Sequence, residues 1–276
     1  MNKKALKKYF VKDLKHGWLW RYQSQALFKF LIDASEFCKN GVVLDAGAGR
    51  QRYKPFFEDS IYVSQEHIEG ISMKNMHSVE YDLIGQIDKK IPLRDNSVDG
   101  ILSTSVVEHL RHPEEFFREA YRILRPGGKL FINCPFCYPE HEEPFDFNRP
   151  TRFGLQEWLK NAGFREVAIE PSSSCTEAVC SFFAFSVWND IRKGNKPGGE
   201  ILRENFLRLP LLCLAKAVYV ISGAICFLVK ISIDRGPHRE TTFPIGWLAV
   251  ATKEANNARP QAFKDKKEFM EKCKNE

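Results

Sequence analysis

A glycine-rich turn after a short apolar stretch is the feature of this sequence best suited to holding a small molecule. Two valines and a leucine precede Asp45, and Gly47 and Gly49 follow it. Glycines let the backbone turn sharply and approach a ligand without a Cβ in the way. Dinucleotide-binding turns need a third glycine, where this chain has Arg52. The turn therefore predicts a ligand site that does not hold the pyrophosphate of a nicotinamide cofactor.

Three further polar groups follow apolar stretches in the way expected of neighbouring strands. Glu66 ends the second stretch, about twenty residues after Asp45, where an acid accepts hydrogen bonds from both hydroxyls of a ribose. Asp82 follows the third stretch, where it could accept a hydrogen bond from an adenine amino group, and Ser103 ends the fourth. Because open α/β sheets bind ligands at the carboxyl ends of their strands, these groups are predicted to share one crevice.

The order of predicted elements is that of an α/β protein. Apolar residues at helical spacing predict a helix over residues 18–38. Two later helices have clear ends: Pro113 begins one and the pair at 127–128 ends it, while Thr151 caps another and Gly163 ends it. The alternation predicts a doubly wound, mostly parallel, seven-stranded sheet with helices on both faces. Its strands are predicted at residues 41–45, 61–65, 78–81, 98–103, 129–134, 164–170 and 246–252.

Residues 42–164 resemble the type 11 family of class I S-adenosylmethionine-dependent methyltransferases, which have a Rossmann-like sheet. The matching motifs are LDAGAG, the acid of YVSQE, YDL, SVDGILSTSVVEHL, EEFFREAYRILRPGG and KLFINCP, in the family's order. The departures are a glutamate for the commoner aspartate at position 66, and Arg50 after the second glycine. The resemblance implies an enzyme with S-adenosylmethionine as its cofactor. It implies that Asp45, Gly47 and Gly49 hold the methionine part, Glu66 the ribose, and Asp82 and Leu83 the adenine, with Ser103 near the methionine end.

A proline-rich loop at residues 135–151 carries candidate groups for the methyl acceptor. Its pattern P-x-H-x-x-P-x-D-x-x-R resembles a loop of bacterial methyltransferases associated with surface-polysaccharide synthesis. A hydroxyl acceptor must lose its proton, which a neutral histidine can accept near neutral pH. His141 is the candidate base, Asp146 would orient it or replace it, and Arg149 would bind substrate. The alternative is that His141 caps a turn and that Asp146 and Arg149 form an ion pair that only staples the loop.

Two neighbouring features are expected to play a smaller part. Glu108 and His109, which family members commonly carry, are expected to shape the floor of the site, not to act as the base. Cys134 and Cys137 look like a redox pair, but such pairs begin a helix, and these end a strand. Zinc bound by both cysteines and His141 would lack a fourth ligand at metal-like spacing. We therefore expect no metal site.

The composition of the chain indicates the cell compartment and the kinds of partner to expect. The net charge of +6 is modest, and eight cysteines, several within apolar stretches, do not form a disulfide framework, which favours a reducing, cytoplasmic compartment. No signal peptide is recognised. The lysines near the N-terminus are either a solvated end or a basic arm for an anionic surface. They are Lys3, Lys4, Lys7, Lys8, Lys12 and Lys15.

The sequence divides into three parts. Residues 1–40 form a basic helical segment, residues 41–253 the methyltransferase domain, and residues 254–276 a charged tail, expected to be a solvated helix or disordered. The domain contains an apolar helical insertion, residues 171–243, before its last strand. Its most apolar part, 209–233, would form a lid, a homodimer face or a contact with the inner membrane surface. It is not expected to cross a bilayer once, because the last strand must return to the sheet.

The predicted function is methyl transfer to a hydroxyl, or less readily an amine, of a small molecule, sugar or glycolipid. One alternative is a nucleic-acid or protein methyltransferase. Base-modifying enzymes, however, usually carry an Asn/Asp-Pro-Pro-aromatic motif after the fourth strand, where this chain has Ser-Thr-Ser-Val at 103–106. The other alternative is a non-catalytic scaffold that binds S-adenosylmethionine, which an intact set of cofactor motifs disfavours. No nucleic-acid partner is therefore expected.

Overall fold

The computed structural model describes most of the predicted domain. The described residues are 20–73, 76, 78–179, 243–255 and 263–274, with the single positions 6, 182, 217 and 221. The lysine-rich N-terminus and nearly all of the predicted apolar insertion, with its segment 209–233, lie outside them. Among the described residues, no helix has the length and apolar character needed to cross a membrane.

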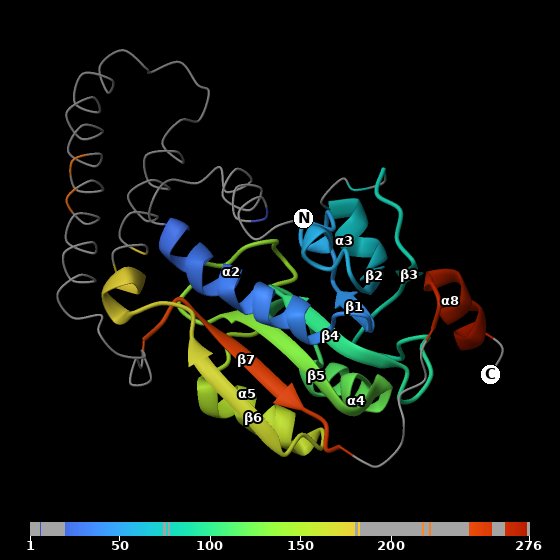
Figure 1. Cartoon of the computed structure of the whole chain (residues 1–276). Coiled ribbons are helices and arrows are strands. Elements are labelled where there is room, and N and C mark those ends of the chain that lie inside the picture. Colours follow the sequence, from blue (N-terminus) through green and yellow to red (C-terminus); the bar gives the residue numbers. More distant parts are fainter. Residues whose placement is uncertain are drawn as a thin grey trace, which may run out of the picture.

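The strands form one seven-stranded sheet in the order β3-β2-β1-β4-β5-β7-β6. Strands β1 to β5 pair in parallel, and β7 runs antiparallel between β5 and β6 (Figure 1). This confirms the predicted α/β fold and its mostly parallel sheet. The strands are β1 (Val42–Ala46), β2 (Ile61–Glu66), β3 (Leu83–Ile84), β4 (Val98–Thr104), β5 (Leu124–Pro135), β6 (Glu166–Pro171) and β7 (Gly246–Thr252).

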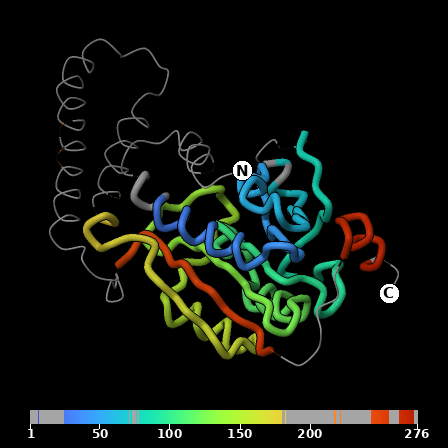
Figure 2. Tube along the Cα trace, in the orientation of Figure 1, coloured from blue at the N-terminus to red at the C-terminus, as the bar shows by residue number. Residues whose placement is uncertain are grey.

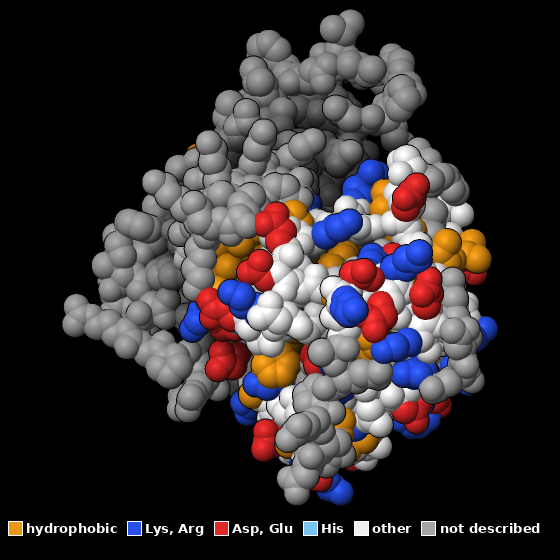
Figure 3. Space-filling view, turned by 45° about the vertical axis from the view of Figure 1, so that its right-hand side comes forward, with side chains coloured by type: hydrophobic (Ala, Val, Ile, Leu, Met, Phe, Trp, Pro, Cys, Tyr) orange, Lys and Arg blue, Asp and Glu red, His pale blue; other side chains and the backbone are white. Residues whose placement is uncertain are grey.

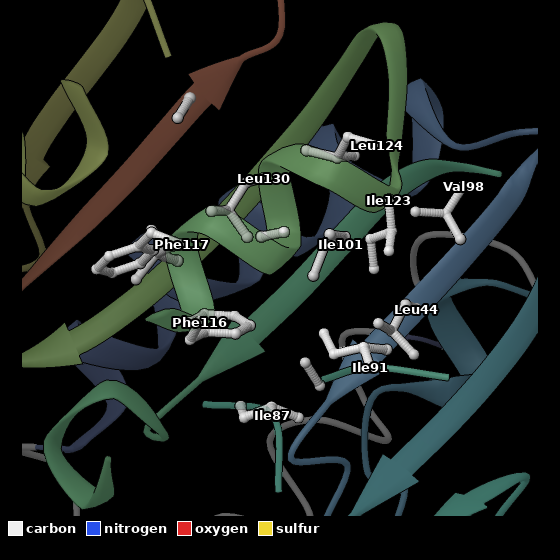
Figure 4. Packing of buried hydrophobic residues seen from close by; sticks show 14 of the residues in the cluster. Leu44, Ile87, Ile91, Val98, Ile101, Phe116, Phe117, Ile123, Leu124 and Leu130 are labelled. Atoms are coloured by element: carbon white, nitrogen blue, oxygen red, sulfur yellow. The ribbon is translucent and has the colours of Figure 1, made fainter. Parts of the chain in front are cut away.

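Helices pack on both faces of the sheet because successive strand side chains point to opposite sides. Leu44 belongs to a core with helices α4 and α5, whereas Val43 packs in a second core with α2. Figure 4 shows Phe116 and Phe117 of α4 in the first core. The helices are α2 (Trp20–Phe37), α3 (Ile68–Met73), α4 (Pro113–Ile123), α5 (Arg152–Asn161) and α8 (Lys266–Lys274), with 3-10 turns η1 (Lys54–Phe56) and η2 (Val107–His109).

Two predicted boundaries are wrong. Residues 78–81 form a turn and loop, and the third strand is the short β3 that follows them. Helix α4 ends at Ile123, four residues before the glycine pair, because Leu124 is already extended. Pro126 disfavours helical geometry at the residue before it, so the chain enters β5 there. The glycine pair therefore lies inside β5 and not at a helix end.

The C-terminal helix α8 packs on the domain and is not merely solvated. Phe269 is fully buried and belongs to the core on the α4 side. Lys266 Nζ lies 2.5 Å from Asp82 Oδ2, which ties the helix to the segment before β3. Figure 2 shows α8 beside this edge of the molecule. The charges of the tail suggested solvent on all sides, but Phe269 anchors the helix, and Phe263, Met270 and Cys273 pack partly buried against the same core.

Candidate functional site

The glycine turn after β1 is held by backbone contacts to the end of β2. Gly47 N donates to Gln65 O and to Gln65 Oε1, each at 3.1 Å. Gly49 N donates to Glu66 Oε2 at 2.7 Å. Both glycines have positive φ, 78° and 53°, which side chains disfavour. A Cβ on Gly47 would also lie 2.4 Å from Cγ2 of Val106, so this turn accepts only glycine at that position.

Glu66 lies at the edge of a pocket with acceptor capacity to spare. Its carboxylate is nearly buried, with Oε1 accepting from His67 N at 2.9 Å and Oε2 from the turn. Each carboxylate oxygen has two lone pairs, so each can accept one more hydrogen bond. This arrangement fits a ligand with a pair of neighbouring hydroxyls.

Asp45 is fully buried at the end of β1, and half of its carboxylate is unsatisfied. The Tyr62 hydroxyl donates to Oδ2, while Oδ1 has no hydrogen-bond partner. Burial raises the pKa of Asp45 to about 7, against the opposing effect of the Tyr62 hydrogen bond. An unpaired buried acceptor costs free energy, so the site favours a ligand that brings a donor or a positive charge.

The pocket beside this turn lies at the carboxyl ends of β1, β2 and β4 and has a volume of about 840 Å³, its open mouth included. One side is formed by Gly47, Glu66 and Gln86, which come from the turn, from β2 and from the loop after β3. The other side is formed by the η2 region and the proline-rich loop, and includes His109, Arg111, Glu142, Phe145 and Phe147.

Five of the seven predicted cofactor residues do not line this pocket: Asp45, Gly49, Asp82, Leu83 and Ser103. Asp82 Oδ2 accepts hydrogen bonds from Ser64 N and Ser64 Oγ, both at 2.8 Å, besides its ion pair with Lys266. Burial raises the pKa of Asp82, but the hydrogen bonds from Lys266 and Ser64 outweigh it and lower the pKa below its ordinary value. Leu83 is a core residue, and Ser103 is fully buried with an unpartnered hydroxyl. The adjoining residues on the pocket wall are Gln86, Ile87, Asp88 and Ser105.

Glu108, expected only to shape the floor, is the most unusual group of the site. It is fully buried, and neither carboxylate oxygen has a hydrogen-bond partner among the described residues. Burial raises its pKa to about 8. The proline-rich loop clamps its backbone: Phe147 N and Asn148 N donate to Glu108 O at 2.7 and 3.1 Å. The loop and the η2 turn therefore form one unit.

Two histidines face Glu108 through their Nε2 atoms. His109 Nε2 lies 3.9 Å from Glu108 Oε1 and 3.7 Å from Glu142 Oε2. His141 Nε2 lies 3.8 Å from the same Glu108 oxygen. The two imidazole centroids are 4.9 Å apart. The proline-rich loop thus brings His141 to the η2 turn, although His141 itself does not line the pocket and His109 does.

Asp146 and Arg149 form an ion pair, which was the predicted alternative to a catalytic and a substrate-binding role. Arg149 Nη2 donates to Asp146 Oδ2 at 2.6 Å and Nη1 to Oδ1 at 2.5 Å. Its remaining N–H groups meet the carbonyls of Tyr138, Pro139 and Asn148, so all five donors of the guanidinium are used within the loop. Asp146 also holds His141, through the backbone N at 2.9 Å and Nδ1 at 3.3 Å.

Cys134 and Cys137 are poorly suited to the redox pair and to the zinc site that were considered for them. Burial raises the pKa of Cys134 above its ordinary range, and burial also raises the pKa of Cys137, whereas redox thiols have lowered pKa values. Among the described residues, the one group of His, Cys, Asp and Glu close enough to hold a metal is Glu108, His109 and His141, which contains neither cysteine.

Comparison with known proteins identifies the segment that carries the turn. Residues 44–132 match the family model of the type 11 methyltransferase domain. These residues therefore belong to the type 11 methyltransferases. The methyltransferase domain match runs from β1 into β5 and includes the glycine turn, Glu66 and the Glu108–His109 pair. It stops before the proline-rich loop that holds His141.

Curated relatives share this domain and differ in their acceptors. An arsenite methyltransferase of Halobacterium salinarum is 29% identical over 42% of this chain and 32% of its own length. A probable S-adenosylmethionine-dependent methyltransferase of Mycolicibacterium smegmatis is 35% identical over 27% of this chain and 32% of its own. Phosphoethanolamine N-methyltransferase 3 of Arabidopsis thaliana is 30% identical over 38% of this chain and 22% of its own. The chain thus spans about a third or less of these relatives.

Solved structures agree on the fold. A crystal structure of a methyltransferase from Archaeoglobus fulgidus superposes with a TM-score of 0.50 at 19% identity, over 89% of this chain and 99% of that chain. The cyclase SpnF superposes equally well, with a TM-score of 0.50 at 16% identity over 84% and 82%. Because one of these structures is described as a cyclase, the fold by itself does not fix the reaction.

Proposed function

We propose that the chain is an enzyme that transfers a methyl group from S-adenosylmethionine to a hydroxyl of a small molecule, sugar or glycolipid, with an amine as the less favoured acceptor. One observation carries this proposal: a single pocket has the glycine turn and Glu66 on one side and the histidine-bearing loop unit on the other. The relatives act on unlike acceptors, so the choice of a hydroxyl rests on the histidines and not on similarity.

The cofactor side of the pocket suits the parts of S-adenosylmethionine. The free acceptors of Glu66 match the two ribose hydroxyls, and the glycine turn leaves room for the methionine part. Asp45 does not line the pocket, but the glycine turn follows it directly, and its unpaired oxygen suits the positive charge of the ammonium group. For the adenine we favour the wall formed by Gln86 and Ile87 over Asp82 and Leu83, because Asp82 is already bonded elsewhere. When bound, S-adenosylmethionine supplies an electrophilic methyl group.

The acceptor side suits removal of a proton. Asp146, whose pKa stays below its ordinary value because hydrogen bonds from Arg149 and His141 outweigh its burial, remains a carboxylate and orients His141. We therefore keep His141 and Asp146 as the predicted catalytic pair and add His109, whose ring reaches the pocket wall. Arg149 is better explained as the residue that fixes the loop than as a substrate contact, since its donors are used.

Nucleic acid is not favoured as the acceptor. Acidic and basic side chains are interspersed over the described part of the face seen in Figure 3, whereas a nucleic-acid site needs clustered basic residues. The cytoplasmic location, peripheral membrane contact, a homodimer and the division at residues 40 and 253 stay predictions.

Calorimetry with the full chain tests the proposal. S-adenosylmethionine and its demethylated product should each bind with a Kd of about micromolar order. Glu66→Ala should weaken both by about tenfold or more, because it removes two acceptors for the ribose. Glu114→Ala, which changes an exposed acid on α4, is the matched control. Wild-type affinity in Glu66→Ala, or tighter binding of NAD, would contradict the proposal.

A further inference from the structure

The three groups that meet behind the acceptor side of the pocket have the composition of a metal site. We propose that Glu108, His109 and His141 bind one divalent transition-metal ion, of the zinc or ferrous class, and leave a position open for the acceptor. Two histidines and one carboxylate are the protein ligands of catalytic zinc sites and of non-haem iron sites, both of which keep an open position.

The first observation is the condition of Glu108. A carboxyl group that is fully buried with two unpartnered oxygens is costly, and proteins usually compensate such a group with a cation or a hydrogen-bond partner. The Nε2 atoms of His109 and His141 lie 3.9 and 3.8 Å from Oε1, too far for a hydrogen bond. Both histidine nitrogens thus approach the same oxygen of the buried carboxyl group without bonding to it.

The second observation is the tautomer that the surroundings impose on each histidine. His109 Nδ1 lies 2.6 Å from the carbonyl of Phe145, which can only accept, so Nδ1 carries the proton and Nε2 the lone pair. His141 Nδ1 faces Pro139 O at 3.2 Å and Asp146 Oδ2 at 3.3 Å, again two acceptors. Metal-binding histidines almost always donate their second N–H to a carbonyl or carboxylate in this way.

Arg149 Nη2 is also 3.5 Å from His141 Nδ1, but its protons are directed to Asp146 and Pro139. Both Nε2 lone pairs therefore face the buried carboxylate.

The distances and charges are compatible with an ion. One ligand atom from each residue lies within 4.8 Å of the others. Ligands about 2.0 Å from a tetrahedral ion are about 3.3 Å apart, so side-chain movements of about an ångström would close the site. Glu142, near His109 Nε2, and Asp146 bring the carboxyl groups around the site to three, and the guanidinium of Arg149 is paired with Asp146. A divalent cation would offset the excess of negative charge.

This inference rests on the proposed function and changes the role of His141 in it: as a metal ligand, His141 activates the acceptor through the ion and does not accept the proton itself. An ion with an open position lowers the pKa of a coordinated hydroxyl. The hydroxyl proton would leave to solvent by way of Glu142, which lies at the pocket wall. The acceptor oxygen then forms the bond to the methyl carbon, the carbon–sulfur bond breaks, and its electron pair stays on sulfur, which becomes a neutral thioether.

Cobalt titration of the chelator-treated full chain tests the site directly. Wild-type protein should bind one equivalent of Co²⁺ with visible d–d absorption and without a thiolate-to-cobalt charge-transfer band. Glu108→Gln and His141→Gln, which nearly preserve side-chain volume, should each weaken binding by about tenfold or more. His112→Gln removes an exposed histidine and should bind as wild type does. Thermal unfolding of each variant verifies that it is folded.

The proposed metal site is overturned if the wild type and both site variants bind cobalt with equal affinity. It is also overturned if the wild type binds no cobalt, or if a thiolate-to-cobalt band appears. The same samples are titrated with the demethylated cofactor product. If the wild-type protein binds the demethylated product but no cobalt, the metal site is rejected and the proposed methyltransferase function stands. Cobalt binding without product binding would reject the methyltransferase and keep the metal site.

Discussion

The two sides of the pocket are built in opposite ways. On the cofactor side, backbone N–H groups of Gly47 and Gly49 meet the end of β2, and Glu66 is held by main-chain donors. On the acceptor side, side chains from distant segments meet: His109 reaches the carbonyl of Phe145, which is 36 residues away. The backbone contacts form in any sequence that keeps the fold and a few glycines. The side-chain cluster, in contrast, can be altered by substituting one residue at a time.

This difference between the two sides agrees with the variety of methyl acceptors among the relatives. The family model matches the segment that carries the backbone-built side, and relatives of this chain are described as acting on acceptors as unlike as arsenite and phosphoethanolamine. The proline-rich loop lies beyond the matched residues. We infer that the acceptor side carries what is particular to this chain, and the predictions below separate the two sides experimentally.

The largest effect is expected on the acceptor side. With a true acceptor, His141→Ala should lower kcat by about a hundredfold, the usual contribution of a positioned acid–base group, because proton removal is lost. Affinity for the demethylated cofactor product should stay within about twofold, since His141 does not line the cofactor side. Steady-state kinetics and calorimetry on one preparation measure both. Unchanged turnover would reassign His141 and Asp146 to loop structure.

On the cofactor side, Gly47→Ala should weaken product binding by about tenfold or more. The new Cβ would overlap Val106, and the positive φ adds roughly 1–2 kcal/mol of backbone strain. Gly49→Ala is the matched variant, because its φ is also positive but no atom lies within 4 Å of a Cβ there. Its loss of affinity should be smaller. Equal losses in the two variants would show that the close approach to Val106 does not matter.

Asp45→Asn should stabilise the protein at high pH while weakening ligand binding. The folded-state pKa of Asp45 is raised by burial from 3.8 to about 7. Between these values the folded state keeps a proton that the unfolded state has lost, so the free energy of unfolding falls as pH rises through this window. Asparagine keeps an acceptor for Tyr62 without the charge.

The measurement for Asp45→Asn is Tm against pH. The variant should exceed wild type by a few degrees at about pH 8 and by little at about pH 4. A Tm difference that does not depend on pH would show that the charge on Asp45 is not the source.

The smallest effect concerns the adenine. Gln86→Ala should weaken product binding by a few fold, and Asp82→Ala should leave it within about twofold, because Gln86 lines the pocket and Asp82 does not. Calorimetry resolves such differences. A larger loss in Asp82→Ala would restore the assignment made from the sequence and would remove Gln86 from the site.

Features that depend on local sequence were predictable. The cap at Thr151 is present, with its hydroxyl accepting from Gly154 N at 3.1 Å, and the last strand has the predicted bounds. Strand β3 was not predictable, since two residues are too few to show a period. Nor was the burial of Glu108 predictable, because Glu108 is clamped by loop residues about forty positions later in the chain. Docking of α8 depends on the buried Phe269 and on a few apolar side chains around it, too few to show a helical pattern.

The position of β7 between β5 and β6 has a consequence for how the protein is made. Strand β6 pairs only with β7 among the described strands, and β7 comes after all other strands in the chain. On a ribosome, β5 and β6 must therefore wait with open edges until residues 246–252 have emerged, and open edges invite pairing with other chains. Fragments that stop before residue 246 should aggregate, and the sheet should close as one late, cooperative event.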